Sequence, residues 1–231
     1  MSFQIMCGMG RTGTLHAWEH AGVPPDLQAC GKGLSGGYAP LSCVLLSPKV
    51  VRAFASGTGA FVNGFTYQSY AVGAAAAKAV LDIFKHDNVV ERCRLAGATL
   101  ERLLRDQIES LAHVGEVRGR GLFWAIELVS DKRTAATYTH EKKASLKVVD
   151  GANDWGVVER DGRVLGPEII CQRIVNHMLT HGGAMVYPCT GTVDGFRGDH
   201  LLIAPPLIIS DLELVKLVTA ARDAIIAVCG N

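Results

Sequence analysis

The sequence predicts an α/β protein in which the end of a large domain is followed by a smaller α+β domain. Its 231 residues are 48% hydrophobic and 19% charged, which is enough for a substantial buried core. The first third is irregular and rich in glycine, whereas helical and strand patterns alternate in the second half. We therefore predict domains of residues 1–110 and 111–231, with a linking helix at the end of the first.

One strand and two helices are predicted in the first domain. Residues 41–46 form the clearest strand, which ends at Ser47 and Pro48. Apolar residues recur at helical spacing over 69–85, where small side chains allow another backbone to approach closely. A second amphipathic helix is predicted over 88–113.

The second domain is predicted to contain three strands and two helices. Residues 130–167 are polar and are interpreted as a long loop, with an insertion at 138–167 that we expect to be exposed and poorly packed. Ser210 is a suitable N-cap for the last helix. The predicted elements are a strand over 123–129, a helix over 168–180, strands over 184–187 and 201–203, and a helix over 211–228.

Composition and charge argue against several classes of protein. The 23 basic and 22 acidic residues give no basic field, so no nucleic-acid partner is expected. The seven cysteines are scattered and odd in number, which favours reduced thiols over a disulfide framework and predicts no metal site. No long apolar run or secretory leader is visible, so we expect a cytoplasmic protein without a membrane partner.

Two glycine motifs fit the dinucleotide-binding pattern G-x-G-x-x-G. They are Gly8-Met9-Gly10-Arg11-Thr12-Gly13 and Gly31-Lys32-Gly33-Leu34-Ser35-Gly36. That fingerprint requires a buried strand before the glycines and a helix after them. Neither context is visible in the sequence, so these glycines are interpreted as turn residues.

Ser35 lies in a G-x-S-x-G motif, which is typical of the nucleophile of α/β-hydrolases. Asp194 or Asp199 and then His200 follow in the hydrolase order. The motif must follow a buried strand, and residues 27–31 are a poor candidate for one. A serine hydrolase that uses Ser35 is therefore an alternative hypothesis.

Lys32 is the other candidate nucleophile. Its neighbours Gly31 and Gly33 leave space around the amine, and such a lysine can form a Schiff base with an aldehyde cofactor. A solvated loop lysine is the competing interpretation, and the spacing alone favours it.

A long, ordered set of motifs resembles the class III aminotransferases, which are pyridoxal-phosphate (PLP) enzymes of fold type I. The motifs include Ala17-Trp18-Glu19, Pro25-Asp26-Leu27, the glycine run 8–13 and the segment 31–41, and they continue through 64–68, 117–123 and 199–206. The resemblance covers nearly the whole chain except about residues 138–167. It implies transfer of an amino group from an amine or omega-amino acid to a 2-oxo acid, in a homodimer.

Three site residues are carried over from this resemblance. Lys32 matches the Schiff-base lysine, which also moves a proton between substrate and cofactor. Thr66 matches the threonine that reaches across the dimer interface to the cofactor phosphate, so the helix over 69–85 is expected at that interface. Arg197 falls within about a residue of an arginine that binds the substrate carboxylate in some members, while a solvated loop arginine is an equal alternative.

The chain departs from the family pattern at its N-terminus. Phe3-Gln4-Ile5 stand where the family has Asp-Glu-Val, whose aspartate pairs with the pyridinium nitrogen. The family's N-terminal half, with its phosphate loop and ring-stacking residue, has no counterpart here. We expect an N-terminally truncated chain that alone neither holds PLP tightly nor transaminates. A silent fragment acting as an association partner and a racemase or mutase relative are the alternatives.

Overall fold

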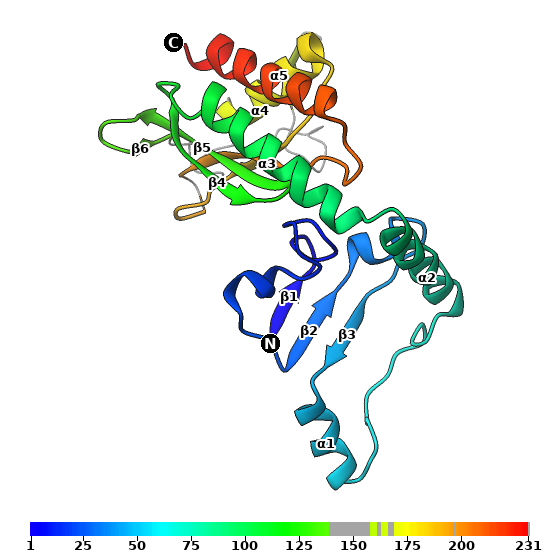
Figure 1. The fold of residues 1–231 in the computed structure, drawn as a ribbon. Coiled ribbons are helices and arrows are strands. Elements are labelled where there is room, and N and C mark those ends of the chain that lie inside the picture. The colour runs from blue at the N-terminus through cyan, green and yellow to red at the C-terminus, as the bar shows by residue number, and fades with distance from the viewer. Residues whose placement is uncertain (139–157, 161–162, 166–168, 196, 231) are drawn as a thin grey trace. The chain divides into compact units, whose positions relative to one another are not determined.

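The computed structural model describes residues 1–138, 158–160, 163–165, 169–195 and 197–230 (Figure 1). The chain divides into two compact units, Met1–Gly97 and Ala98–Asn231, and the division falls inside helix α3 (Val89–Gln107). The assignment of family domains to 1–110 and 111–231 stays a prediction.

A three-stranded sheet organises the first unit. Strand β2 (Leu27–Cys30) lies between β1 (Ser2–Gln4) and β3 (Cys43–Leu46), parallel to β1 and antiparallel to β3. The predicted strand at 41–46 is confirmed with a later start. Our judgement that 27–31 is a poor strand was wrong, because the polar side chain of Gln28 is buried in the sheet.

Two further helices belong to this unit. Helix α1 (Pro48–Ser56) was not predicted, although Ser47 caps it and proline occupies its first turn. Helix α2 (Ala71–His86) confirms the predicted helix and buries the stripe Gly73, Ala77 and Val80 within the chain. Whether other small residues of α2 contact a second subunit stays a prediction.

The second unit contains an antiparallel sheet whose strands follow the order β4-β5-β10-β9. Strand β6 pairs with the end of β5, at Val129 and Asp131. The strands are β4 (Val114–Arg120), β5 (Phe123–Asp131), β6 (Ala136–Thr137), β9 (Tyr187–Thr190) and β10 (Asp199–Ile203). The sequence located β5 and β10, placed β9 three residues too early, and missed β4. Strands β7 (Val158–Arg160) and β8 (Arg163–Leu165) pair as a hairpin within the predicted loop, whose residues 139–157 lie outside the described ones.

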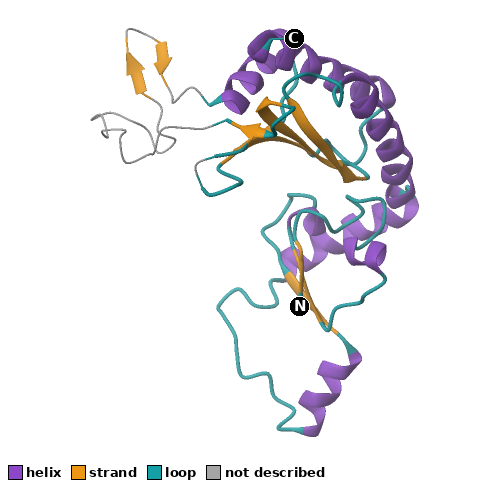
Figure 2. Cartoon of the chain, turned by 90° about the vertical axis from the view of Figure 1, so that its left-hand side faces the viewer, coloured by secondary structure: helices purple, strands orange, loops and turns teal. Residues whose placement is uncertain are grey.

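Helices α4 (Ile170–His177) and α5 (Asp211–Cys229) lie along one face of this sheet (Figure 2). Both were predicted, and α4 continues into a π-helical turn over Met178–Gly182. Trp124, Ile126 and Leu128 alternate along β5 and are fully buried on the core side. A capping box between Ser210 and Glu213 begins α5, as the sequence indicated.

Candidate active site

Lys32 begins a short 3-10 helix, Lys32–Ser35, that follows β2 after Gly31. Its backbone has φ +46°, in the left-handed region that residues with a side chain rarely adopt. Such a conformation is retained only where the surroundings fix it, and functional sites are a common place for it. The amine-bearing side chain is exposed. Neither cavity described below includes Lys32, so the role of the space expected around its amine stays a prediction.

Packing around the glycine motif is tight only at Gly36. A methyl group at Gly33 would meet the Met9 side chain at an ordinary contact distance of 3.4 Å, whereas one at Gly36 would meet Val80 at 3.1 Å. Gly36 also has φ +60°, which ends the short helix after Ser35. The motif thus serves as a tight turn, as expected, and it directs the chain away from β2 immediately beyond Lys32.

Phe3 lies on the first strand next to β2, opposite Ala29 in register. Its side chain is 68% exposed, whereas the neighbouring Gln4 is 4% exposed. Side chains alternate between the two faces of a strand, so Phe3 and Gln4 point to opposite sides of the sheet. An apolar ring therefore occupies the position that the resemblance assigns to a carboxylate.

Two buried amides on the Gln4 side hold the segment before β2 in place. Gln28 accepts a hydrogen bond from Trp18 Nε1 at 2.6 Å, and its amide lies 2.8 Å from His16 Nδ1. Gln4 Oε1 accepts from the Ala17 backbone N–H at 2.7 Å. Sequence reasoning missed this network, whose only signal was two glutamines on short strands. It fixes the segment around His16 and Trp18 against β1 and β2, the strands that carry Phe3 and precede Lys32.

Thr66 lies in an exposed turn before α2, where its hydroxyl is open to a ligand. Its neighbours Phe65 and Tyr67 line a cavity of about 1080 Å³, together with Pro40, Leu41, Ser42, Gln68, Ser69, Tyr70 and Ala74. Thr66 does not line this cavity, and no described contact joins it to Lys32. The predicted pairing of these two residues in one site stays a prediction.

Ser35 does not have the geometry of a nucleophile. It is 2% exposed, and its hydroxyl donates to the Ala39 carbonyl at 2.6 Å. A hydrolase serine has to present its oxygen to the substrate and to a base. The structure does contain a strand, β2, before the motif. The buried Ser35 hydroxyl is nevertheless evidence against the hydrolase hypothesis.

Arg197 belongs to the second unit, in the glycine-rich loop between β9 and β10. Its Nε donates to Asp194 Oδ2 at 2.8 Å, and its backbone N–H donates to Asp194 Oδ1 at the same distance. Both side chains are substantially exposed. An exposed pair of this kind contributes little stability, and a substrate carboxylate would have to compete with Asp194 for the guanidinium. Sequence reasoning missed this partner.

A second cavity, of about 730 Å³, lies within the second unit and is mostly apolar. Residues of α4, the π-helical turn after it, α5 and β9 line it, including Val175, Leu179, Tyr187 and Leu217. Over the described ranges, no three His, Cys, Asp or Glu side chains gather as a metal site would need. Among the helices described, none has both the length and the apolar character needed to cross a bilayer.

Comparison with known proteins agrees with the resemblance seen in the motifs. The model of the family "Aminotransferase class-III" matches residues 4–225. An aminotransferase of Gibberella zeae is 37% identical over 227 residues, which are 98% of this chain and 39% of that protein. An uncharacterized aminotransferase of Schizosaccharomyces pombe is 38% identical over 222 residues, 96% of this chain and 42% of that protein.

A solved structure gives the same result. The PLP-bound amine transaminase of an uncultivated Pseudomonas species has a TM-score of 0.76 and 28% identity, covering 97% of this chain and 44% of that one. The chain thus spans about two fifths of the length of the curated relatives above. Its fold is that of PLP-dependent transaminases of fold type I. The family model extends over nearly the entire sequence, and this chain belongs to the class III aminotransferase family.

Proposed function

We propose that this chain contributes the lysine-bearing part of a PLP-dependent aminotransferase, which moves an amino group from an amine or omega-amino acid to a 2-oxo acid. The observation that carries the proposal is Lys32, an exposed amine on a left-handed backbone immediately after β2, within a chain of this family. When bound, PLP supplies an aldehyde and an electron-withdrawing ring.

The residues of this chain fit some contacts to PLP and not others. The Lys32 Nζ is open to an aldehyde; in its neutral form it can take a proton from a substrate carbon, and in its protonated form it can give one back. The Thr66 hydroxyl can donate to a phosphate oxygen. Phe3 offers no carboxylate to the ring nitrogen. We therefore propose weak cofactor binding by this chain alone and a requirement for further protein contacts.

The oligomeric state and the location are part of the same proposal. We propose a homodimer in the cytoplasm, with Thr66 and α2 at the subunit interface. The exposed small residues of α2, Ala74 and Ala75, support close contact with a second chain. A catalytically silent chain that acts as an association partner is the second candidate, and the position of Phe3 favours it.

Chemical trapping tests the role of Lys32. The chain is incubated with less than one equivalent of PLP, reduced with borohydride and digested, and the modified lysines are mapped by mass spectrometry. We expect Lys32 to be labelled well ahead of Lys49, another exposed lysine, which is 3.4 Å from Asp26. Lys32→Ala should abolish the main label and Lys49→Ala should retain it. Equal labelling of the two lysines would contradict the proposal.

Dialysis and an amino-transfer assay test whether the chain suffices. We expect PLP to be lost on dialysis and no useful turnover with amine and 2-oxo acid. Stoichiometric retention that disappears in Lys32→Ala, together with turnover, would show that this chain is a complete catalyst.

A further inference from the structure

Two cysteines face each other across the strands that frame Lys32. Cys30 ends β2, Cys43 begins β3, and the two residues are direct partners in the antiparallel register. Both pack in one apolar cluster with Met9 and Leu34. The sequence analysis treated all seven cysteines as scattered, because pairing across strands is not visible in the spacing.

We propose that Cys30 and Cys43 are a reversible redox pair. Peroxide converts the two thiols into a disulfide that links the two ends of the segment carrying Lys32. Directly opposed residues of an antiparallel pair have Cα atoms about 4.5–5.5 Å apart, inside the disulfide range of about 4.4–6.8 Å. Their Cβ atoms are about 4.5–5.5 Å apart, slightly more than the usual 3.5–4.5 Å of a disulfide. The strands must approach a little to form the bond, which makes it easier to reduce.

The accessibility of the two sulfurs sets the order of the steps. Cys43 is partly exposed and Cys30 is 3% exposed, so peroxide meets Cys43 first. An S–O bond forms as the peroxide O–O bond breaks, giving a sulfenic acid on Cys43. The Cys30 thiolate then attacks this sulfur, the S–S bond forms and the S–O bond breaks. Two thiols and one peroxide yield one disulfide and two waters, with the two electrons passing from sulfur to oxygen.

The bond would tether both ends of residues 31–42, and Lys32 is the second residue of that segment. The proposal depends on thiol geometry alone and does not require PLP binding. Burial, followed by the proximity of Cys30, raises the pKa of the Cys43 thiol above its usual value. Because the thiolate is the form that reacts with peroxide, the oxidation rate should rise by about tenfold for each unit of pH increase, as long as the pH stays below that pKa.

Cys7 is the competing partner. Its thiol lies near Cys30 and donates weakly to Gln4 Oε1 at 3.8 Å. Cys7 lies outside strands β2 and β3, so it is not a register partner of Cys30. The experiment therefore has to distinguish a Cys30–Cys43 bond from a Cys7–Cys30 bond.

Peptide mapping after mild peroxide treatment tests the proposal. The reduced chain is treated with about one equivalent of hydrogen peroxide, alkylated and digested without reductant. We expect a linked Cys30–Cys43 peptide, two hydrogens lighter than the reduced peptides, that dithiothreitol converts back. Cys43→Ser and Cys43→Ala should both abolish the link. Cys7→Ser and Cys189→Ser should keep it, as matched controls.

Two results would overturn the proposal. One is a Cys43 sulfinic or sulfonic acid without any link to Cys30, and the other is a predominant Cys7–Cys30 bond. Hydrogen–deuterium exchange gives an independent measurement, in which amides of 31–42 should exchange at least about threefold more slowly in the oxidised chain. An unchanged exchange rate in a fully linked chain would contradict the tethering of this segment.

Discussion

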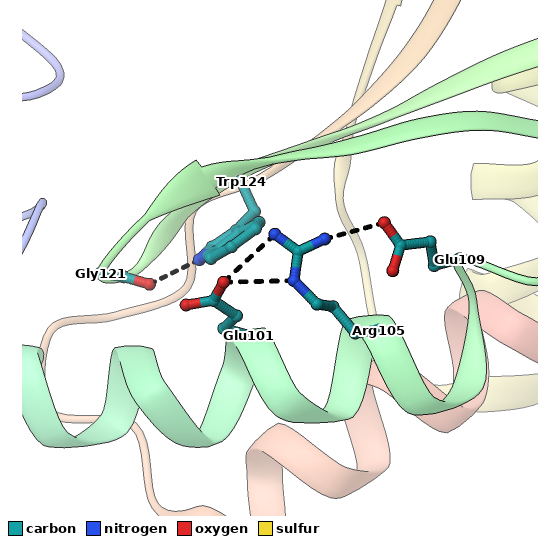
Figure 3. Close-up of polar contacts among 5 residues, drawn as sticks. All are labelled: Glu101, Arg105, Glu109, Gly121 and Trp124. Carbon is teal, nitrogen blue, oxygen red and sulfur yellow. Dashed lines mark hydrogen bonds and ion pairs between the residues drawn. The ribbon is translucent and has the colours of Figure 1, made fainter.

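The guanidinium carbon of Arg105 lies over the indole ring of Trp124, 5.7 Å from the ring centroid (Figure 3). Arg105 is held there by Glu101, whose Oε1 accepts from Nε and Nη2 at 3.2 Å, and by Glu109, whose Oε1 accepts from Nη1 at 2.8 Å. Trp124 Nε1 donates to the Gly121 carbonyl at 2.7 Å. One arginine thus connects α3 to the β4–β5 hairpin within the second unit.

Arg105→Ala should lower the free energy of unfolding of the second unit by about 0.5–2 kcal/mol. The loss combines a cation–π contact of about 0.5–1 kcal/mol with exposed ion pairs worth about 0–1 kcal/mol. Urea titration followed by tryptophan fluorescence measures it. Arg102→Ala is the matched control, because Arg102 lies on the same helix with a single 3.4 Å contact to Asp106. Equal destabilisation by both variants would show that the indole contact contributes nothing.

Gly119→Ala should destabilise the β4–β5 hairpin by at least about 1–3 kcal/mol, the usual cost of overpacking. A Cβ atom there would collide with the Phe123 carbonyl oxygen and lie 2.6 Å from Trp124 Cα. Backbone atoms cannot rotate away as a side chain can. Gly57→Ala is the control, since its Cβ would meet the Ala53 carbonyl at an ordinary 3.5 Å. A thermal melt in which both variants match the wild type would contradict this prediction.

His200 predicts a pH dependence of stability. Its Nδ1 is buried without a hydrogen-bond partner among the described residues. Burial is the main cause that lowers the pKa of the His200 imidazole, and the positive charge of Arg118 lowers it further. The negative charges of Glu127 and Asp199 oppose this shift. The folded state therefore favours the neutral ring, and the unfolded state binds more protons at intermediate pH.

The free energy of unfolding should therefore decrease as the pH drops below about 6.5, the ordinary pKa of histidine. The decrease should continue until the pH reaches the lower pKa of His200 in the folded state. Urea midpoints at pH 7.5 and 5.5 measure the change. His200→Gln removes the titrating group, so its midpoint should fall less than that of the wild type. If both proteins lose the same stability, other groups govern this pH range.

Phe3→Asp should increase the affinity of the chain for PLP by about tenfold to a hundredfold, provided that the proposed function is right. A charge-assisted hydrogen bond to the ring nitrogen is worth about 1.5–3 kcal/mol. Because Phe3 is exposed, the change should not unfold the sheet. Equilibrium dialysis measures the affinity, and Phe3→Asn is the neutral control of the same shape. Equal affinity of the Asp and Asn variants would show that residue 3 does not face the ring.

Helices α2, α4 and α5 were predicted because their apolar spacing is local information, whereas α1 was missed. The buried stripe Gly73, Ala77 and Val80 of α2 follows helical periodicity, and the Ser210 cap marks the start of α5. Residues 27–31 were judged a poor strand, yet the Gln28 amide is satisfied by Trp18 and His16 once it is buried in β2. That satisfaction depends on the start of the 3-10 helix Ala17–Ala21, which lies outside β2, so the periodicity of the strand does not reveal it.

Only the features of the candidate site that lie within sequence motifs could be predicted. The turn around Lys32 agrees with the glycine pattern, while the exposure of its side chain is also what a solvated loop lysine would show. The burial of Ser35 and the pairing of Arg197 with Asp194 depend on side-chain orientation within a loop. Such orientations follow from tertiary packing and turn geometry, which residue spacing does not encode.

The pairing of β5 with β10 has a consequence for how the family can vary. Ile126 is the register partner of Leu201, so this central pair of the sheet joins residues that are far apart in the sequence. The connection between β5 and β10 carries α4 and β9, and β9 pairs with β10, so it is held at these elements and does not behave as one flexible loop. The two strands that it joins must keep their alternation of buried side chains.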